Sequence, residues 1–172
     1  MINLNFLEKD LIKSNLDVKP SEKLAAYTSI GIGGRAKFFV EVLNTKQLEL
    51  AVKLAFKHKA PYLVIGRGSN IIISDSGYDG LVILNSTNNW QVLETSSNLQ
   101  KKMTQSRFKP LDSEYLADSY RVSDFKNKQR NHVIVRADSG LRISKLMNSL
   151  FEEGISGLQW FAGIPGTIGG AI

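Results

Sequence analysis

The sequence predicts an α/β fold, in which short apolar strands alternate with amphipathic helices. Two observations support this. Strand-like apolar runs flank a helical pattern within residues 37–84, and a strand followed by a helix recurs at 133–153. The chain has 172 residues, of which 42% are hydrophobic and 22% charged, an ordinary balance for a folded domain. This length suits one domain, or one domain and part of a second.

Residues 27–85 are expected to form a compact α/β unit that an N-terminal arm precedes. Residues 1–26 predict a leading arm with a short helix near 6–14, and a turn-rich loop follows at 27–34. Strands are predicted at 37–42, 62–65, 71–74 and 81–84, with a turn at 76–80; the strand at 62–65 is apolar throughout, as in a covered sheet. A helix is predicted at 45–59, capped by Asn44 or Thr45, with an apolar stripe of Leu48, Ala51, Val52 and Ala55.

Residues 86–132 differ from the rest because they are polar and rich in Ser, Asn, Gln and Lys. They predict an insertion with a possible strand at 90–93, followed at 95–131 by a long insertion or mobile loop that could include a short helix near 113–117. Residues 133–172 then begin a second unit, with a strand at 133–137 and a helix at 141–153 that Gly154 ends in a left-handed conformation. The expected core face of this helix is Ile143, Leu146, Met147, Leu150 and Phe151.

Composition excludes several classes of function. The chain has no cysteine, so disulfides, thiol nucleophiles and cysteine metal sites are excluded. Its two histidines, His58 and His132, are far apart, so no metal site is expected, and His58 is expected to be exposed at the polar end of its helix. The net charge is +6, but the basic residues are scattered, which argues against a nucleic-acid partner. No secretory signal or membrane-length apolar run is present, so a cytoplasmic location and no membrane partner are expected. The chain is separately expected to be a monomer.

Two glycine-rich loops carry the functional signal. GRGSN (66–70) directly follows the predicted strand at 62–65, and GIPGTIGGA (163–171) follows the second predicted helix. Small residues expose backbone N–H groups, which can surround a phosphate. The first loop is neither a Rossmann fingerprint nor a P-loop. Each loop also has a purely structural explanation, the first as a tight turn between strands and the second as a tightly packed strand–turn–helix junction.

Four stretches together resemble the UDP-N-acetylenolpyruvoylglucosamine reductases, the FAD-dependent UDP-N-acetylmuramate dehydrogenases. They are YTSIGIGGRA (27–36), LVIGRGSNI (63–71) with DG (79–80), GISGL (154–158) and FAGIPGTIGGA (161–171). The resemblance implies an FAD-binding fold of the vanillyl-alcohol-oxidase type with two subdomains. The first subdomain would span 27–85, and the second would begin at 133–172 and be truncated at the C-terminus.

The resemblance also implies a function in peptidoglycan precursor synthesis. NADPH would reduce a non-covalently bound FAD, and the reduced flavin would reduce the enolpyruvyl group of a UDP-sugar substrate. The cofactor-binding residues implied by the two loops are Gly66, Arg67, Gly68, Ser69, Asn70, Ile71, Gly163, Ile164, Pro165, Gly166, Thr167, Gly169, Gly170 and Ala171. The Arg67 guanidinium could pair with a phosphate or be exposed to solvent.

The chain also departs from the family. The family's catalytic arginine, serine and glutamate follow the motif that ends at Ala171, so none maps onto this chain, and the chain alone is expected to be inactive. Asp138 stands in a segment that is usually small and glycine-rich in the family, and it places a negative charge near the expected FAD phosphates unless its side chain points to solvent. Two alternatives remain. One is a non-catalytic module that binds FAD or a nucleotide. The other is a related flavin oxidase, although covalent flavin attachment is not expected, because the loop at 66–70 has no histidine and the chain has no cysteine.

Overall fold

The structure is a computed structural model that describes residues 4–95 and 133–172. The chain divides into two compact units, one comprising residues 1–90 with 137–172 and the other residues 91–136. The helix predicted near 113–117 and most of the predicted insertion lie outside the described residues. Within these residues, no helix is long and apolar enough to cross a membrane.

A four-stranded mixed sheet forms the centre of the first unit. Its strands are β1 (Val18–Lys23), β2 (Arg35–Val42), β3 (Tyr62–Ile65) and β4 (Tyr78–Asn85), in the order β1-β2-β4-β3. β1 runs antiparallel to β2, whereas β4 runs parallel to both β2 and β3. The predicted α/β class is confirmed by this sheet and by the helices that flank it.

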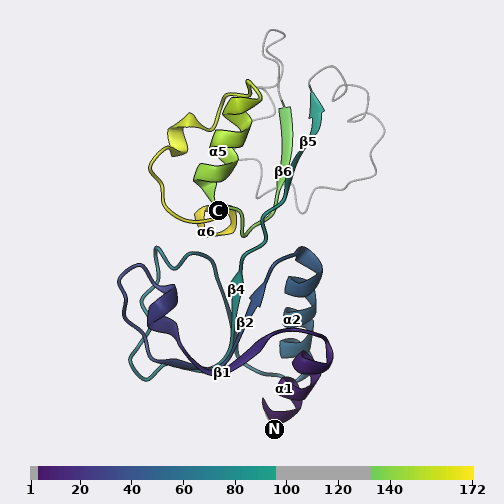
Figure 1. Cartoon of the computed structure of the whole chain (residues 1–172), viewed down its shortest axis with the longest axis vertical. Helices are drawn as coiled ribbons and strands as arrows, with labels where there is room; N and C mark the ends of the chain where they lie inside the picture. Colours follow the sequence, from purple (N-terminus) through teal and green to yellow (C-terminus); the bar gives the residue numbers. More distant parts are fainter. Residues whose placement is uncertain (1–3, 96–132) are drawn as a thin grey trace, which may run out of the picture. The chain divides into compact units, whose positions relative to one another are not determined.

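Two helices cover one face of the sheet (Figure 1). They are α1 (Leu4–Lys13) and α2 (Thr45–Lys57), and α2 is capped by Asn44, whose Oδ1 accepts a hydrogen bond from Gln47 N at 3.0 Å. Leu7 and Leu11 of α1 are fully buried in this core, and each contributes about 1.5–3 kcal/mol of transfer free energy. The predicted helix at 45–59 is therefore confirmed, with its end two residues earlier.

The first 26 residues do not form a separate arm. α1 contributes to the core, and β1 pairs with β2 from Val18↔Val40 to Lys23↔Arg35. β1 was not predicted because its sequence, VKPSEK, contains a proline and three charges. A proline is tolerated there because β1 is an edge strand.

The opposite face of the sheet is covered by the 3₁₀ helix η1 (Leu24–Tyr27) and by the loop that joins β3 to β4. Residues 71–74 belong to this loop, so the strand predicted there is wrong. Ile73 instead packs in a buried cluster with Leu24 and Phe39, and Ser74 O accepts a hydrogen bond from Gly34 N at 2.9 Å. Ile73 alone of this run is buried, and Ile72 is 81% exposed, so the run is a loop that packs one isoleucine side chain fully on the sheet. β4 also begins at Tyr78, inside the predicted turn at 76–80.

Two expectations about burial are wrong. β3 is an edge strand in which Tyr62 and Val64 are exposed and only Ile65 is buried, so it is not covered on both faces.

His58 has a side chain that is only 13% exposed, because its Nε2 lies 2.9 Å from Asp10 Oδ2. The Lys57 ammonium lies 2.8 Å from the same oxygen. These contacts join the end of α2 to α1.

The C-terminal part of the first unit contains α5 (Ile143–Glu152), the 3₁₀ helix η3 (Gln159–Phe161) and α6 (Ile168–Ala171). The predicted second helix is confirmed as α5, with Ile143, Leu146 and Leu150 buried. Phe151 was expected on the core face but is 81% exposed, because it lies outside the stripe of those three residues. Gly154 has φ +73°, which confirms the predicted left-handed cap.

The remaining strands are β5 (Trp90–Thr95) and β6 (Val133–Ala137), which pair in a two-stranded sheet. Both strands were predicted from the sequence, and β5 extends two residues beyond its predicted end. Together they account for the described residues of the second unit, 91–95 and 133–136.

Candidate functional site

The first glycine-rich loop follows the carboxyl end of β3. In open α/β sheets, ligands bind at this edge, beyond the carboxyl ends of the parallel strands. Within the described part of the chain, the backbone N–H groups of Arg67, Gly68, Ser69 and Asn70 donate no hydrogen bond. A hydrogen bond from Ser29 N to Gly68 O, at 2.9 Å, restrains the loop. The loop therefore presents unpaired backbone N–H groups on a restrained backbone.

The second loop lies against the first, although 96 residues separate Ser69 from Pro165. The Ser69 hydroxyl donates to Pro165 O at 3.4 Å, and a Cβ added at Gly66 would lie 2.6 Å from the Thr167 hydroxyl oxygen. A cleft of about 470 Å³ lies between the loops. We call it the loop cleft; its lining residues are Val64, Ile65, Gly66, Arg67, Gly68, Ser69, Asn70, Ile71, Ile164, Pro165, Gly166, Thr167, Gly170 and Ala171.

The structure thus brings together twelve of the fourteen residues predicted from the two loops. The other two lie outside the lining. Gly169 packs against Ser139, with 2.8 Å between an added Cβ and the Ser139 Cβ, whereas Gly163 has no atom within 4 Å of an added Cβ. Their roles differ accordingly, since Gly169 permits close packing and Gly163 forms an open turn.

The second loop is fixed to the base of α5. Arg142 and Thr167 form an isolated antiparallel bridge. On either side of it, Gly166 O accepts from Ile143 N at 3.3 Å, and Leu141 O accepts from Ile168 N at 2.9 Å. Thr167 and Leu141 are both buried. The start of α5 and the second loop therefore behave as one packed piece.

The two first-loop glycines are required by packing. A Cβ at Gly68 would overlap the Tyr27 carbonyl oxygen, and one at Gly66 would overlap the Thr167 side chain. The glycine signal is thus explained at these two positions by contact with other parts of the protein. The capacity to bind an anion rests on the free N–H groups of the loop.

Asp138 does not line the loop cleft. Its Oδ2 accepts hydrogen bonds from Asn89 N at 2.9 Å and from Asn89 Nδ2 at 3.2 Å, and Asn89 O accepts from Asp138 N at 2.8 Å. The carboxylate therefore ties together the two chain segments that lead to β5 and from β6. The negative charge that the sequence placed near the expected phosphates is therefore not part of the loop-cleft lining.

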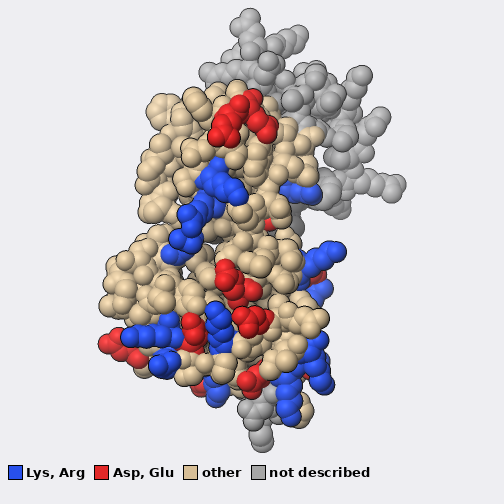
Figure 2. Space-filling view, in the orientation of Figure 1, with Lys and Arg blue, Asp and Glu red and all other residues tan. Residues whose placement is uncertain are grey.

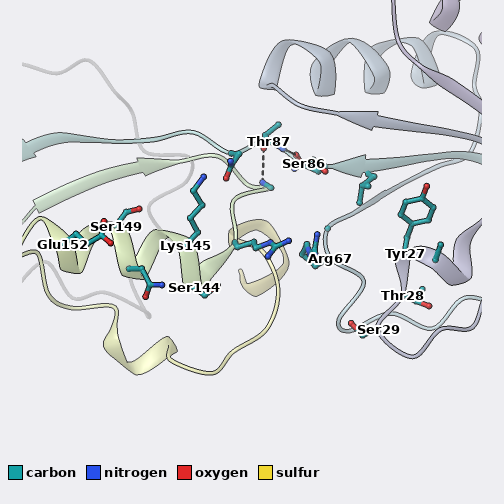
Figure 3. Close-up of a pocket in the computed structure, with 18 residues that line it drawn as sticks. Tyr27, Thr28, Ser29, Arg67, Ser86, Thr87, Ser144, Lys145, Ser149 and Glu152 are labelled. Atoms are coloured by element: carbon teal, nitrogen blue, oxygen red, sulfur yellow. Dashed lines mark hydrogen bonds between the residues drawn. The ribbon is translucent and has the colours of Figure 1, made fainter.

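A second, wider cleft of about 890 Å³ shares Gly66 and Arg67 with the loop cleft. We call it the wide cleft. Arg142, Lys145 and Glu152 line it from α5 and its cap, and Ser86 and Thr87 line it from the segment after β4 (Figure 3). Figure 3 shows Lys145 extending away from α5 toward Ser86 and Thr87. Figure 2 shows a band of Lys and Arg side chains over α5 and α6.

The sequence did not single out Arg142 and Lys145. The sequence did contain an indication. Both residues stand at the start of a predicted helix, where a positive side chain is electrostatically unfavourable because the N-terminal end of the helix dipole is also positive. No acidic residue stands in the first turn of α5 to balance them.

Tyr27 lines the wide cleft as a neutral phenol. Its hydroxyl donates to Glu22 Oε1 at 2.8 Å, and its ring stacks on Phe39 at a centroid distance of 4.3 Å. Burial, and then the hydrogen bond to Glu22, raise the pKa of Tyr27 to about 12. Tyr27 is therefore protonated at neutral pH and contributes structure and polarity rather than acid–base chemistry.

No protein-family model matches the chain. Several curated relatives do, and all those compared here are named UDP-N-acetylenolpyruvoylglucosamine reductase. The protein of Anoxybacillus flavithermus is 30% identical over 167 residues, which is 96% of this chain and 43% of that protein. The proteins of Clostridioides difficile and Chlamydia felis are 30% and 27% identical over 98% and 96% of this chain, and 42% and 43% of their own lengths.

The fold has a counterpart among solved structures. The crystal structure of UDP-N-acetylenolpyruvylglucosamine reductase from Thermus caldophilus matches with a TM-score of 0.53 and 21% identity, over 91% of this chain and 41% of that one. The chain thus spans about 43% of the length of the first relative it matches. The resemblance seen in the four sequence motifs is confirmed: over 96% of its length, this chain is similar to proteins named UDP-N-acetylenolpyruvoylglucosamine reductase.

Proposed function

We propose that this chain is the FAD-binding part of an NADPH-dependent reductase that converts UDP-N-acetylenolpyruvoylglucosamine to UDP-N-acetylmuramate. The observation that carries the proposal is the meeting of the two glycine-rich loops, which are remote in sequence and enclose one cleft. The similarity to the named reductases gives the reaction class. On this proposal, residues 27–85 form the first subdomain of a vanillyl-alcohol-oxidase-type fold, and residues 133–172 begin the second.

The loop cleft has the properties that a pyrophosphate requires. Four successive N–H groups, from Arg67 to Asn70, are free within the described residues, and the Ser69 hydroxyl adds a donor. Donors of this kind satisfy phosphate oxygens without a counter-ion. These residues would hold the FAD pyrophosphate, and the second loop from Ile164 to Ala171 would lie along the rest of the cofactor.

The bound flavin would supply the hydride chemistry, as is general for flavoproteins. The contribution of this chain is positioning. The bridge between Arg142 and Thr167 fixes the second loop, and the hydrogen bond from Ser29 N to Gly68 O fixes the first. A rigid cradle lowers the entropy lost when an extended cofactor binds. The NADPH and UDP-sugar steps belong to the complete reductase on this proposal, and we expect no turnover from this chain alone.

Flavin retention tests the proposal. The purified chain is mixed with FAD and desalted, and the flavin absorbance that remains is measured. We expect the wild type to retain flavin and Ser69→Asp to lose it, because a carboxylate in the cradle repels the phosphates. Ser76→Asp is the matched control, since Ser76 lies on the same β3–β4 loop and its hydroxyl contacts Ser74 at 2.9 Å, outside the loop cleft.

Two results would contradict the proposal. A folded wild-type chain without bound flavin would mean that the loop cleft does not hold the cofactor, and equal retention by the two variants would place the flavin elsewhere. NADPH oxidation that depends on the UDP-enolpyruvyl sugar is measured in parallel. Turnover by the purified chain would overturn the expectation that it needs the rest of the reductase, whereas retained flavin without turnover agrees with a binding role for this part.

A further inference from the structure

The first glycine-rich loop rests on residues 27–29, which we call the support segment (Figure 3). Ser29 N donates to Gly68 O at 2.9 Å, and a Cβ added at Gly68 would overlap the Tyr27 carbonyl oxygen. Gly68 therefore packs directly against this carbonyl. It also lies within the run of N–H groups, residues 67–70, that are free in the described part of the chain. The direction of these N–H groups thus depends on where the support segment is held.

The Tyr27 side chain anchors the support segment to the sheet at two points. Its ring stacks on Phe39, with a centroid distance of 4.3 Å and an interplanar angle of 30°. Phe39 is fully buried in β2, which is paired on one side with β1 and on the other with β4. The Tyr27 hydroxyl donates to Glu22 Oε1, on β1, at 2.8 Å. The two contacts fix both the position and the orientation of the ring.

The other contacts of the support segment do not reach the sheet. The Thr28 hydroxyl donates to Ile32 O at 2.8 Å and lies 3.4 Å from Ala25 O, so it joins the segment only to its own neighbours in the sequence. Ser29 N is used by the first loop. Among the hydrogen bonds and ring contacts of the described residues, only those of the Tyr27 side chain connect the support segment to a strand.

We propose that Tyr27 is a positioning residue for phosphate binding by the first glycine-rich loop. Its ring and hydroxyl hold the support segment on the sheet, and the support segment holds Gly68, so that the N–H groups of residues 67–70 are arranged before a phosphate binds. Such preorganisation raises affinity because less entropy is lost on binding. Tyr27 acts through Gly68 rather than by contact with the ligand. The inference rests on the proposed function, in which this loop holds the FAD pyrophosphate.

The dissociation constant of FAD, measured by the quenching of flavin fluorescence, tests this role. Tyr27→Phe keeps the stacked ring and removes the hydroxyl, and we expect it to weaken FAD binding about threefold to tenfold, the effect of one typical hydrogen bond on an equilibrium. Tyr78→Phe is the matched control. Tyr78 packs against the same buried cluster as Tyr27, lines neither cleft and has no hydroxyl hydrogen bond among the described residues. It should change the affinity less than twofold.

Variants of Glu22 separate the hydrogen bond from general stability. Glu22→Gln keeps a side-chain oxygen that can accept from Tyr27, so it should bind FAD within twofold of the wild type. Glu22→Ala removes the acceptor and should reproduce the loss seen in Tyr27→Phe. The double variant should lose no more than either single variant, because both remove the same bond. Independent, additive losses would contradict a shared bond.

A second measurement needs no flavin. Backbone order parameters from NMR relaxation should fall at residues 67–70 in Tyr27→Phe and stay at wild-type values in Tyr78→Phe. They decide the role of Tyr27 even if the wild type retains no flavin, a result that would contradict only the proposed function. Three outcomes would overturn the inference: wild-type FAD affinity in Tyr27→Phe, an equal loss in Tyr78→Phe, and unchanged order parameters at residues 67–70 in Tyr27→Phe.

Discussion

The substitution Gly68→Ala tests whether the first loop is held by close packing. Gly68 has φ +63°, and its added Cβ would lie 2.9 Å from both the Tyr27 carbonyl carbon and the Thr28 Cα, and closer still to the Tyr27 carbonyl oxygen. These are backbone atoms, so no side-chain rotation can relieve the overlap. The Thr28 hydroxyl also donates to Ile32 O at 2.8 Å, which restrains the segment further.

The magnitude has two parts. A left-handed alanine costs about 1–2 kcal/mol, partly offset by the lower entropy of the unfolded chain. Forcing an extra atom into a packed interior adds about 1–3 kcal/mol. We therefore expect Gly68→Ala to lower the free energy of unfolding by about 2–4 kcal/mol. Gly31→Ala is the control, since Gly31 has φ +70° with no atom within 4 Å of the added Cβ, and it should cost about 1 kcal/mol.

Urea unfolding, followed by tryptophan fluorescence, measures both variants. At this chain length, the predicted difference corresponds to a shift of about 2–4 °C in melting temperature for each kcal/mol. If Gly68→Ala and Gly31→Ala are equally destabilised, the overlap with Tyr27 does not decide the cost. The inference that packing fixes the first loop would then be refuted.

Two further predictions concern the core and the acid limit of stability. Leu146→Ala should lower the free energy of unfolding in urea by about 2–5 kcal/mol, because Leu146 is buried. Phe151→Ala, at an exposed position on the same helix, should change it by no more than about 0.5 kcal/mol. Equal losses in the two variants would contradict the assignment of Leu146 to the buried face of α5. Hydrogen bonds from Lys57 and then His58 lower the pKa of Asp10 from 3.8 to about 2, so this carboxylate stabilises the fold above pH 3.8 and its contribution is lost as the pH falls toward 2. Melting curves from pH 5 to 2 should show a smaller pH-dependent loss in Asp10→Asn than in the wild type, and identical slopes would exclude this role.

Local patterns predicted most of the regular elements because their periodicity and caps are properties of neighbouring residues. α2 and α5 have the expected apolar stripes, and the short strands β3 and β6 lie where β-branched residues gather. β1 could not be predicted in this way. It is a strand because β2 offers it a hydrogen-bonding edge, and this tertiary contact outweighs its proline and charges.

The strand predicted at 71–74 is wrong for the related reason that a run of hydrophobic residues specifies neither the backbone conformation nor the burial of each side chain, since Ile72 is 81% exposed. Ile73 is buried as expected, but in a loop over the sheet face. His58 was placed in solvent because its partner, Asp10, is 48 residues away in the sequence. Pairings of this range are not visible in a local pattern.

For the candidate site, the sequence predicted which loops are involved but not the contacts between them. The two loops were identified by composition, and the family resemblance placed them on one ligand. The sequence could not reveal that Gly66 meets Thr167 or that Gly68 meets Tyr27, since these contacts depend on the folded arrangement. Arg142 and Lys145 were not singled out, although their place at the start of a predicted helix was a usable signal, and only the folded arrangement shows that they line one cleft with Arg67.

The contacts between the end of β4 and the start of α5 act as a clasp. Asn85 Nδ2 donates to Ser139 Oγ at 2.8 Å, and Gly140 N donates to Thr87 Oγ1 at 3.0 Å. Asn85 and Thr87 are both buried, so the clasp is part of the protein interior. It fixes both ends of the intervening chain at one place.

Because these contacts hold the two ends together, the free energy of closing the chain between them depends only weakly on its length. For a flexible loop in general, doubling or halving its length changes the closure free energy by only about 0.6 kcal/mol. The clasp therefore holds the end of β4 against the start of α5 largely independently of the number of residues between them.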